Sequence, residues 1–278
     1  MWKVYAAPIT LMLAKSLPVL AALSLLACSN EPETAHCTAS GLPISGIVET
    51  GGLGGDTGDH ALIVPQGMAV TPRPGINSVF NVTALTLRAG PNGAELYAAV
   101  RNDGQVIACN PSFSVELRDK DDQTIGTGVS GLITRSFYLF KDGSGTIAGC
   151  AAPGEGTMVA ILRLPLDAPI ENVVNVVYQS NYWANLELTA LDGVSLTGVE
   201  AVARSTGVAY TGALVNGLGT TLTGPTVAVF PVNSVGRPLG VAYGGSPALV
   251  LEPCGTWHFE TSAISEPGVG YDAYPMGG

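Results

Sequence analysis

The side chains best suited to chemistry are three closely spaced carboxylates, Asp119, Asp121 and Asp122. Neighbouring carboxylates can bind Ca²⁺ through their oxygens or act as a general acid and base. The three residues lie in a short charged run between two apolar segments, where a turn between strands is expected. We therefore interpret them as the solvated tip of a hairpin rather than as a catalytic or metal site.

The histidines and serines form no further constellation. His36, His60 and His258 are scattered, and no spacing between them and a cysteine matches a metal site. The Gly143-Ser144-Gly145 segment lacks the strand-to-helix turn that a nucleophilic serine requires. The sequence therefore predicts no catalytic residue, no metal ligand and no cofactor, and a hydrolase is the least favoured class.

The chain contains five cysteines, none arranged as C-x-x-C, so neither a zinc ribbon nor a thioredoxin-like site is expected. The first of them, Cys28, directly follows an apolar run over residues 17–27. That run is too short to span a bilayer and has the length of the apolar region of a signal peptide. Lys3 and Lys15 supply the positive charge, and the start of translation is left open between Met1 and Met12.

The Leu25-Leu26-Ala27-Cys28 segment resembles the lipobox of bacterial lipoproteins. The resemblance implies that residues 1–27 are removed as a lipoprotein signal peptide and that Cys28 is lipidated. Each buried methylene contributes roughly 0.8 kcal/mol, so several acyl chains on one cysteine anchor it firmly. By the same resemblance, the non-acidic Ser29 favours the outer membrane. An ordinary signal peptide, or a buried helix that ends in cysteine, is the alternative.

With Cys28 lipidated, an even number of cysteines remains for an oxidising compartment, namely Cys37, Cys109, Cys150 and Cys254. Cys109 and Cys150 each precede a predicted strand in the same region, which favours a disulfide between them. Closing that loop contributes about 3–4 kcal/mol. Cys37 would then pair with Cys254. Free, buried thiols are the alternative.

The composition indicates short strands joined by many turns. The chain has 36 Gly and 19 Pro, 46% hydrophobic residues and only 12% charged residues, whereas a disordered chain has low hydrophobicity and high charge. Its net charge of −10 repels phosphate backbones, so no nucleic-acid partner is expected. The same charge opposes docking on anionic lipid, which leaves membrane association to Cys28.

A flexible tether is expected over residues 28–75, because this segment is rich in Gly and Pro. Within it, residues 51–57 match the start of a calcium-binding nonapeptide, but a single copy is present where a stack is needed. Alternating apolar residues begin at Phe80 and predict the strands of a β-sandwich. The Gly- and Pro-rich residues 265–278 are expected to form a flexible tail.

A weak internal repeat relates two segments at an offset of 114 positions, for example Asn102 with Asn216 and Pro111 with Pro225. Residues 157–160 also resemble residues 256–259 at an offset of 99, which implies an insertion of about 15 residues near 137–148. The repeat predicts two tandem sandwiches, over 76–168 and 193–264. Residues 169–192 either complete the first copy or bridge the two. One larger β domain is the alternative.

The pattern Tyr97-x-x-Val100-x-Asn102, followed by Pro111-x-Phe113-x-Val115-x-Leu117-x-Asp119, resembles the bacterial FxLYD-type domain. The second copy repeats part of this pattern with Tyr210, Asn216, Pro225 and Val229. The resemblance implies an all-β fold of two tandem immunoglobulin-like β-sandwiches and an extracytoplasmic module without catalytic residues. Two positions depart from the pattern: Asp122 replaces a hairpin glycine, and Asn233 replaces the second aspartate.

Together these patterns predict a lipid-anchored, non-catalytic protein of the bacterial cell envelope that acts as an interaction or spacer module. The expected partners are the membrane, through lipidated Cys28, and an envelope protein or glycan. The outer membrane is the expected location, on its periplasmic or surface face. The alternative function is a carbohydrate- or peptidoglycan-binding module that uses sandwich loops near Trp183 or Trp257.

Overall fold

The computed structural model describes residues 45–47, 67–75, 78–134, 136–141, 146–184, 187–191 and 193–276. Across these ranges the regular structure is β, apart from a single-turn 3₁₀ helix, η1 (Ile170–Asn172). The described part of the chain holds no helix with the length and apolarity needed to cross a bilayer. The prediction of an all-β fold is confirmed.

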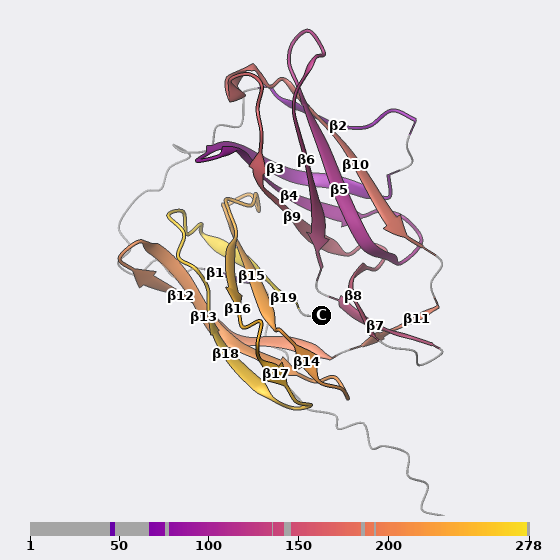
Figure 1. The fold of residues 1–278 in the computed structure, drawn as a ribbon, viewed down its shortest axis with the longest axis vertical. Helices are drawn as coiled ribbons and strands as arrows, with labels where there is room; N and C mark the ends of the chain where they lie inside the picture. The colour runs from indigo at the N-terminus through magenta and orange to yellow at the C-terminus, as the bar shows by residue number, and fades with distance from the viewer. Residues whose placement is uncertain are drawn as a thin grey trace, which may run out of the picture. The chain divides into compact units, whose positions relative to one another are not determined.

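The first sandwich consists of two layers that share one strand (Figure 1). One layer has the order β2-β10-β5-β6 and the other has the order β6-β9-β4-β3. Strand β6 belongs to both, because its residues up to Gly131 pair with β5 while Leu132 and Ile133 pair with β9. The strands are β2 (Ala69–Pro72), β3 (Phe80–Gly90), β4 (Gly93–Asn102), β5 (Ala108–Arg118), β6 (Thr124–Ile133), β9 (Gly156–Leu164) and β10 (Asn175–Trp183).

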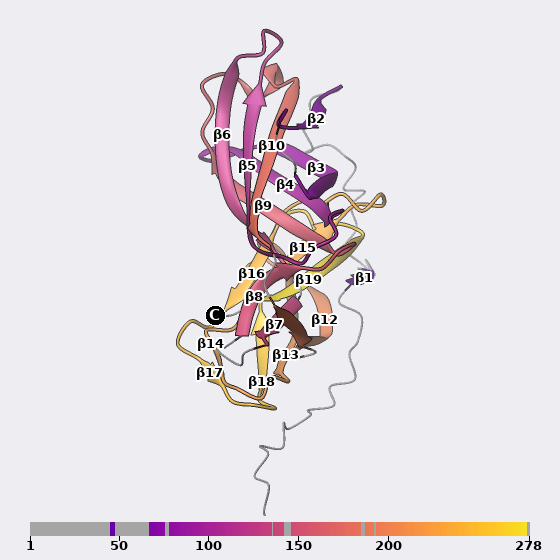
Figure 2. The same cartoon turned by 90° about the vertical axis from the view of Figure 1, so that its right-hand side faces the viewer.

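Period-two alternation places the core of this sandwich. Phe113, Val115 and Leu117 of β5 are buried between the layers, while the intervening Ser114 and Glu116 face outward. Figure 2 shows β5, β6 and β10 as neighbours within one layer. Apolar side chains fill the inner face of this layer. Its polar outer face is partly accessible to solvent.

The insertion predicted near residues 137–148 is a hairpin of β7 (Ser136–Phe140) and β8 (Thr146–Ala151). Strand β8 pairs with the start of β5, and β11 (Leu188–Leu191) pairs with β7. The insertion therefore extends the β5 layer beyond the sandwich core.

The second sandwich repeats the two-layer arrangement with the orders β12-β13-β18 and β1-β19-β15-β16. Its strands are β1 (Ser45–Ile47), β12 (Val194–Arg204), β13 (Gly207–Asn216), β15 (Thr226–Val232), β16 (Ala242–Gly245), β18 (Thr256–Glu260) and β19 (Gly270–Met276), with a short pair of β14 (Leu222–Thr223) and β17 (Val250–Leu251). Its own core contains Leu196, Tyr210, Leu214, Val227 and Val229.

The predicted offset of 114 is present in the structure. Strands β12 and β13 begin and end 114 positions after β3 and β4. The buried Asn102 and Asn216 make the same hydrogen bonds: each side-chain amide donates to two backbone carbonyls, and each side-chain oxygen accepts one backbone N–H. These six bonds are 2.8–3.0 Å long. Equivalent positions therefore have the same structural role.

In each copy, one position at the start of a strand can be occupied only by glycine. Gly93 and Gly207 begin β4 and β13 with φ of 121° and 138°. A Cβ at these positions would clash with the backbone oxygens of Leu164 and Ile264 respectively. Both the left-handed backbone and the close approach exclude a side chain.

Three sequence-based boundaries are corrected. The flexible tail expected at 265–278 is wrong, because β19 pairs with β15 from Gly270 to Met276 and buries Tyr274. The segment 169–192 contains β10, which pairs along β5 and so completes the first copy. The tether expected at 28–75 contains β1 and β2, which pair with β19 and β10.

The β18 register also corrects the expected offset for the end of the repeat. Thr157 pairs with Val100, whereas Trp257 pairs with the equivalent Leu214, so the offset there is 100 rather than 99. The similarity between residues 157–160 and residues 256–259 is too short to fix their alignment, because a shift by one residue also matches apolar residues. The strand pairing fixes it.

A third apolar cluster joins the sandwiches, which belong to one compact unit. Outward-facing side chains of β4, β6 and β9 contribute Tyr97, Ile133, Met158 and Ala160. The outward face of β15 and β19 contributes Ala228, Phe230 and Tyr274. The Phe230 and Tyr274 rings meet edge to face, with centroids 5.8 Å apart. We call this contact the junction.

Candidate functional site

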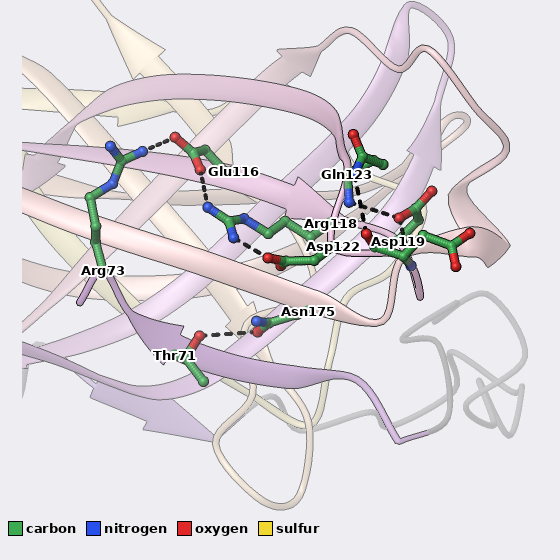
Figure 3. Close-up of polar contacts among 9 residues, drawn as sticks. Thr71, Arg73, Glu116, Arg118, Asp119, Asp122, Gln123 and Asn175 are labelled. Carbon is green, nitrogen blue, oxygen red and sulfur yellow. Dashed lines mark hydrogen bonds and ion pairs between the residues drawn. The ribbon is translucent and has the colours of Figure 1, made fainter.

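The acidic cluster shapes its own turn. The Asp119 carboxylate accepts hydrogen bonds from the backbone N–H groups of Asp121 and Gln123, both at 2.9 Å (Figure 3). Asp122 has a left-handed backbone, with φ of 60°, and pairs with Arg118 at 2.8 Å. Within the described ranges, no group of three or more His, Cys, Asp or Glu side chains is arranged to hold a metal ion.

The second copy shows that this turn does not depend on negative charge. Asn233 accepts the equivalent hydrogen bonds from the backbone N–H groups of Val235 and Arg237. Gly236 occupies the left-handed position that Asp122 fills in the first copy. An aspartate and an asparagine thus make the same Asx-type turn, and Asp122 and Gly236 take the same left-handed position after it.

The structure joins Cys109 to Cys150, the pair favoured from the sequence, with an S–S distance of 1.99 Å. Both residues are buried and lie opposite each other on β5 and β8. The bond fixes the inserted hairpin to the sandwich. Cys254 is also disulfide-bonded. Cys37, its expected partner, and Cys28 lie outside the described residues, as do His36, His60 and Ser144.

His258 lies on the outer face of β18, beside a shallow hollow of about 620 Å³. The neighbouring Glu260 is paired with Arg204 at 2.7 Å. The hydrogen bond from Arg204 lowers the pKa of the Glu260 carboxyl, so this acid stays ionised. A permanently charged carboxylate that already has a partner is poorly suited to proton transfer.

A second hollow lies on the first sandwich and has a volume of about 120 Å³. Its lining comes from β5, β6 and β10 and from the residue that follows β2. We call this surface the outer β5–β10 face and define it by Arg73, Ser114, Glu116, Thr127, Val129 and Gln179, together with Asn181 and Trp183 at the end of β10.

Backbone pairing brings these residues together from distant parts of the chain. Ser114 of β5 lies opposite both Gln179 of β10 and Val129 of β6. Strand β2 runs parallel to β10, and the backbone N–H of Arg73 donates to the carbonyl of Tyr178 at 2.8 Å. Arg73, which directly follows β2, thereby contributes its guanidinium to the same face.

One end of the outer β5–β10 face is charged but balanced. Glu116 forms ion pairs with both Arg73 and Arg118, and Arg118 also pairs with Asp122 (Figure 3). The Nε of Arg118 is buried and has no hydrogen-bond partner among the described residues. In this network the two cations, Arg73 and Arg118, are balanced by the two anions, Glu116 and Asp122.

The other end is neutral and carries exposed apolar groups. The Gln179 amide donates to Asn181 at 3.1 Å, and the Ser114 hydroxyl donates to the Gln179 carbonyl at 3.4 Å. Trp183 is 57% exposed and Val129 is 71% exposed. A tryptophan ring exposed beside hydrogen-bonding groups offers a ligand both an apolar surface and polar partners.

The equivalent surface of the second sandwich is covered by protein. The positions of Ser114 and Glu116 correspond, at the offset of 114, to Ala228 and Phe230 in the junction. Gln179 corresponds by strand pairing to Tyr274. The same face of the repeated fold is therefore apolar where it contacts a sandwich and polar where it does not.

Polar contacts surround the junction. Arg88 donates to the carbonyl of Leu239 at 3.1 Å, pairs with Glu266 at 3.2 Å and lies 5.1 Å from the centre of the Tyr97 ring. The Tyr97 hydroxyl donates to Glu95 at 2.8 Å. Burial raises the pKa of Tyr97 above its ordinary range, with Arg88 opposing and Glu95 reinforcing the shift.

The outer β5–β10 face was not predicted as a site from the sequence, although Trp183 was named. A usable signal was present in the repeat, where polar residues of the first copy align with Ala228 and Phe230 of the second. Arg73 carried no such signal, because only strand pairing places β2 beside β10.

The fold and this surface define an all-β protein made of two repeated sandwiches, the first of which carries the polar outer β5–β10 face. No protein-family model matches the chain, and no curated protein matches it. The resemblances to the lipobox and to FxLYD-type domains accordingly remain predictions.

Proposed function

We propose that the chain is a lipid-anchored protein of the bacterial cell envelope whose joined sandwiches act as a non-catalytic interaction or spacer module. Three features support this proposal. The Leu25–Cys28 segment resembles a lipobox. The buried disulfide between Cys109 and Cys150 suits an oxidising compartment. The net charge of −10 disfavours docking on anionic lipid, so an acyl anchor is the simplest means of membrane association.

The observation that carries the module role is the junction. Apolar side chains from both sandwiches are buried together, and Arg88 and Thr86 of the first sandwich bond to Leu239 and Pro238 of the second. A module that presents a surface at a distance from its anchor needs its parts held in a fixed arrangement. Buried apolar contacts reinforced by polar contacts provide that restraint.

The anchor is tested by fractionating a Gram-negative host that expresses the full-length protein or its Cys28→Ser variant. The wild-type protein should sediment with membranes and require detergent for release, whereas the variant should be soluble after lysis. Mass spectrometry of the N-terminal peptide should show an acylated Cys28. The matched control, Cys37→Ser, should stay in the membrane fraction. Retention of the Cys28→Ser variant in membranes would falsify the anchor.

Glycan binding is the second candidate function, and the exposed Trp183 favours it. Trp257, the other aromatic residue named for this role, packs on Phe259 and on the second core, so it is less available to a ligand. A single exposed tryptophan on a polar sheet face is a more specific feature than the sandwich fold, which hosts many functions.

A further inference from the structure

The outer β5–β10 face differs in chemistry from the equivalent face at the junction. In the second sandwich this face carries Ala228, Phe230 and Tyr274, which pack against another sandwich. In the first sandwich Ser114, Glu116 and Gln179 occupy the equivalent positions. An apolar surface like that of the junction would leave these polar groups without partners, so it is a poor occupant of the face.

Neutral hydrogen-bonding groups follow one another along β10 and β5. Gln179 and Asn181 are two positions apart on β10, which spaces them by about 6.6 Å along the strand. Ser112 and Ser114 lie opposite them on β5. Amides and hydroxyls both donate and accept hydrogen bonds, as the hydroxyl groups of a sugar do.

Trp183 is held at the end of this row by the strands around it. The neighbouring Tyr182 points inward and meets Phe80 at a centroid distance of 6.3 Å, so Trp183 faces outward. A β-bulge in β5 at Asn110, which has φ of 46°, brings Trp183 opposite Cys109 of the disulfide. Bulges often redirect a side chain beside a functional surface, and the disulfide fixes the backbone there.

The charged end of the face does not select for ionic ligands. Glu116 is already paired with Arg73 and Arg118, so neither an added anion nor an added cation finds an unpaired opposite charge there. The chain as a whole has a net charge of −10, which disfavours acidic ligands. The remaining chemistry favours an uncharged ligand with many hydroxyl or acetamido groups and an apolar ring face.

The geometry points to the outer β5–β10 face as a binding site for an uncharged glycan chain. Trp183 stacks on one pyranose ring, whose C–H groups pack on the indole. Gln179, Asn181 and Ser114 bind the hydroxyl or acetamido groups of the following sugars. A sugar ring has an apolar C–H face and a rim of hydroxyl groups, which an indole ring and neighbouring amides and hydroxyls complement. This inference rests on the proposed role as an envelope interaction module and names its ligand class.

The test is isothermal titration of the purified full-length protein with chitotetraose and with cellotetraose. Chitotetraose represents N-acetylated glycans of cell walls, and cellotetraose represents glycans that carry hydroxyls alone. Saturable binding of either one is expected. Trp183→Ala should weaken that binding at least tenfold, and Gln179→Ala should weaken it three- to tenfold. The control Val235→Ala, at a position 75% exposed in the second sandwich, should leave affinity unchanged.

Two outcomes overturn the inference: no heat of binding for either sugar, or binding that survives in the Trp183→Ala, Gln179→Ala double variant. Circular dichroism of each variant shows whether the fold is kept, and Trp183→Phe should retain part of the affinity. The anchor experiment on Cys28 has a different readout. If the sugars do not bind while the wild-type protein stays membrane-anchored, the envelope role stands and the glycan site is rejected.

Discussion

Asn102 and Asn216 show how one buried side chain can specify a turn. Each is completely buried, donates both amide hydrogens to backbone carbonyls and accepts one backbone N–H. A buried polar group is tolerated when all of its hydrogen bonds are made. The recurrence of the same three bonds at an offset of 114 makes these residues the clearest marker of the repeat.

Replacing Asn216 by alanine should destabilise the protein by about 2–4 kcal/mol, because two carbonyls and one N–H lose their partner inside the core. Urea unfolding followed by tryptophan fluorescence measures the change. Asn172→Ala, at an exposed position of η1, is the control and should change stability by less than about 0.5 kcal/mol. Equal effects of the two substitutions would contradict the role given to Asn216.

Several tyrosines predict sensitivity to alkaline pH. Burial raises the pKa of Tyr97, Tyr210, Tyr243 and Tyr271 above their ordinary value of about 10. A raised pKa in the folded state means that the folded protein holds these protons more tightly than the unfolded chain. Their contribution is therefore complete below pH 10 and is lost as the pH rises further.

We expect the thermal midpoint to be constant between about pH 7 and 9 and to fall above about pH 10. Calorimetry at stepped pH measures this dependence. Tyr97→Phe removes one of the titrating groups and should make the alkaline decline less steep. A midpoint that rises through pH 10 would be incompatible with this assignment of the tyrosines.

At the scale of the elements, β19 is the clearest correction to the sequence-based boundaries. It lies between β1 and β15 and pairs with β15 from Gly270 to Met276. Tyr271 and Tyr274 are 7% and 2% exposed and belong to the second core and the junction respectively. A segment rich in Gly and Pro is therefore a central strand.

Deleting residues 265–278 should unfold the second sandwich, because β15 loses one of its two neighbours, the second core loses Tyr271 and the junction loses Tyr274. Limited proteolysis should then cut within residues 193–264 while the first sandwich stays protected. Deleting only residues 277–278 is the control and should leave the digestion pattern unchanged. If the longer deletion leaves that pattern intact as well, β19 is dispensable.

At the scale of the molecule, the junction couples the two sandwiches. Phe230 is fully buried, meets the Tyr274 ring and belongs to one apolar cluster with side chains of β4 and β9. The outward faces that correspond to this contact, around Glu116 in the first sandwich and His258 in the second, are polar. Among the described residues, these two faces therefore lack the apolar side chains that the junction buries.

We expect the wild-type protein to unfold in a single calorimetric transition, since neither sandwich buries its junction face alone. Phe230→Ala should cost about 3–5 kcal/mol and separate the transition into two. Val129→Ala, at an exposed position of the other outer face, is the control and should retain one transition. Two transitions in the wild-type protein would show that the junction does not couple the sandwiches.

The sequence by itself determined the all-β class, the repeat at an offset of 114, the insertion and the disulfide partners Cys109 and Cys150. These features depend on local alternation, turn residues and cysteine spacing, which are properties of neighbouring residues. Lipidation of Cys28 also follows from a local motif, and it stays a prediction.

Only the tertiary structure decided which face of each sandwich is covered. Alternation shows that Ser114 and Phe230 point out of their own cores, but it does not show what lies beyond them. Long-range pairing likewise placed β2, β10 and β19, because hydrogen bonds between distant strands leave no period in the chain. The polar outer β5–β10 face, with Arg73, Gln179 and Trp183 assembled on it, is a product of that pairing.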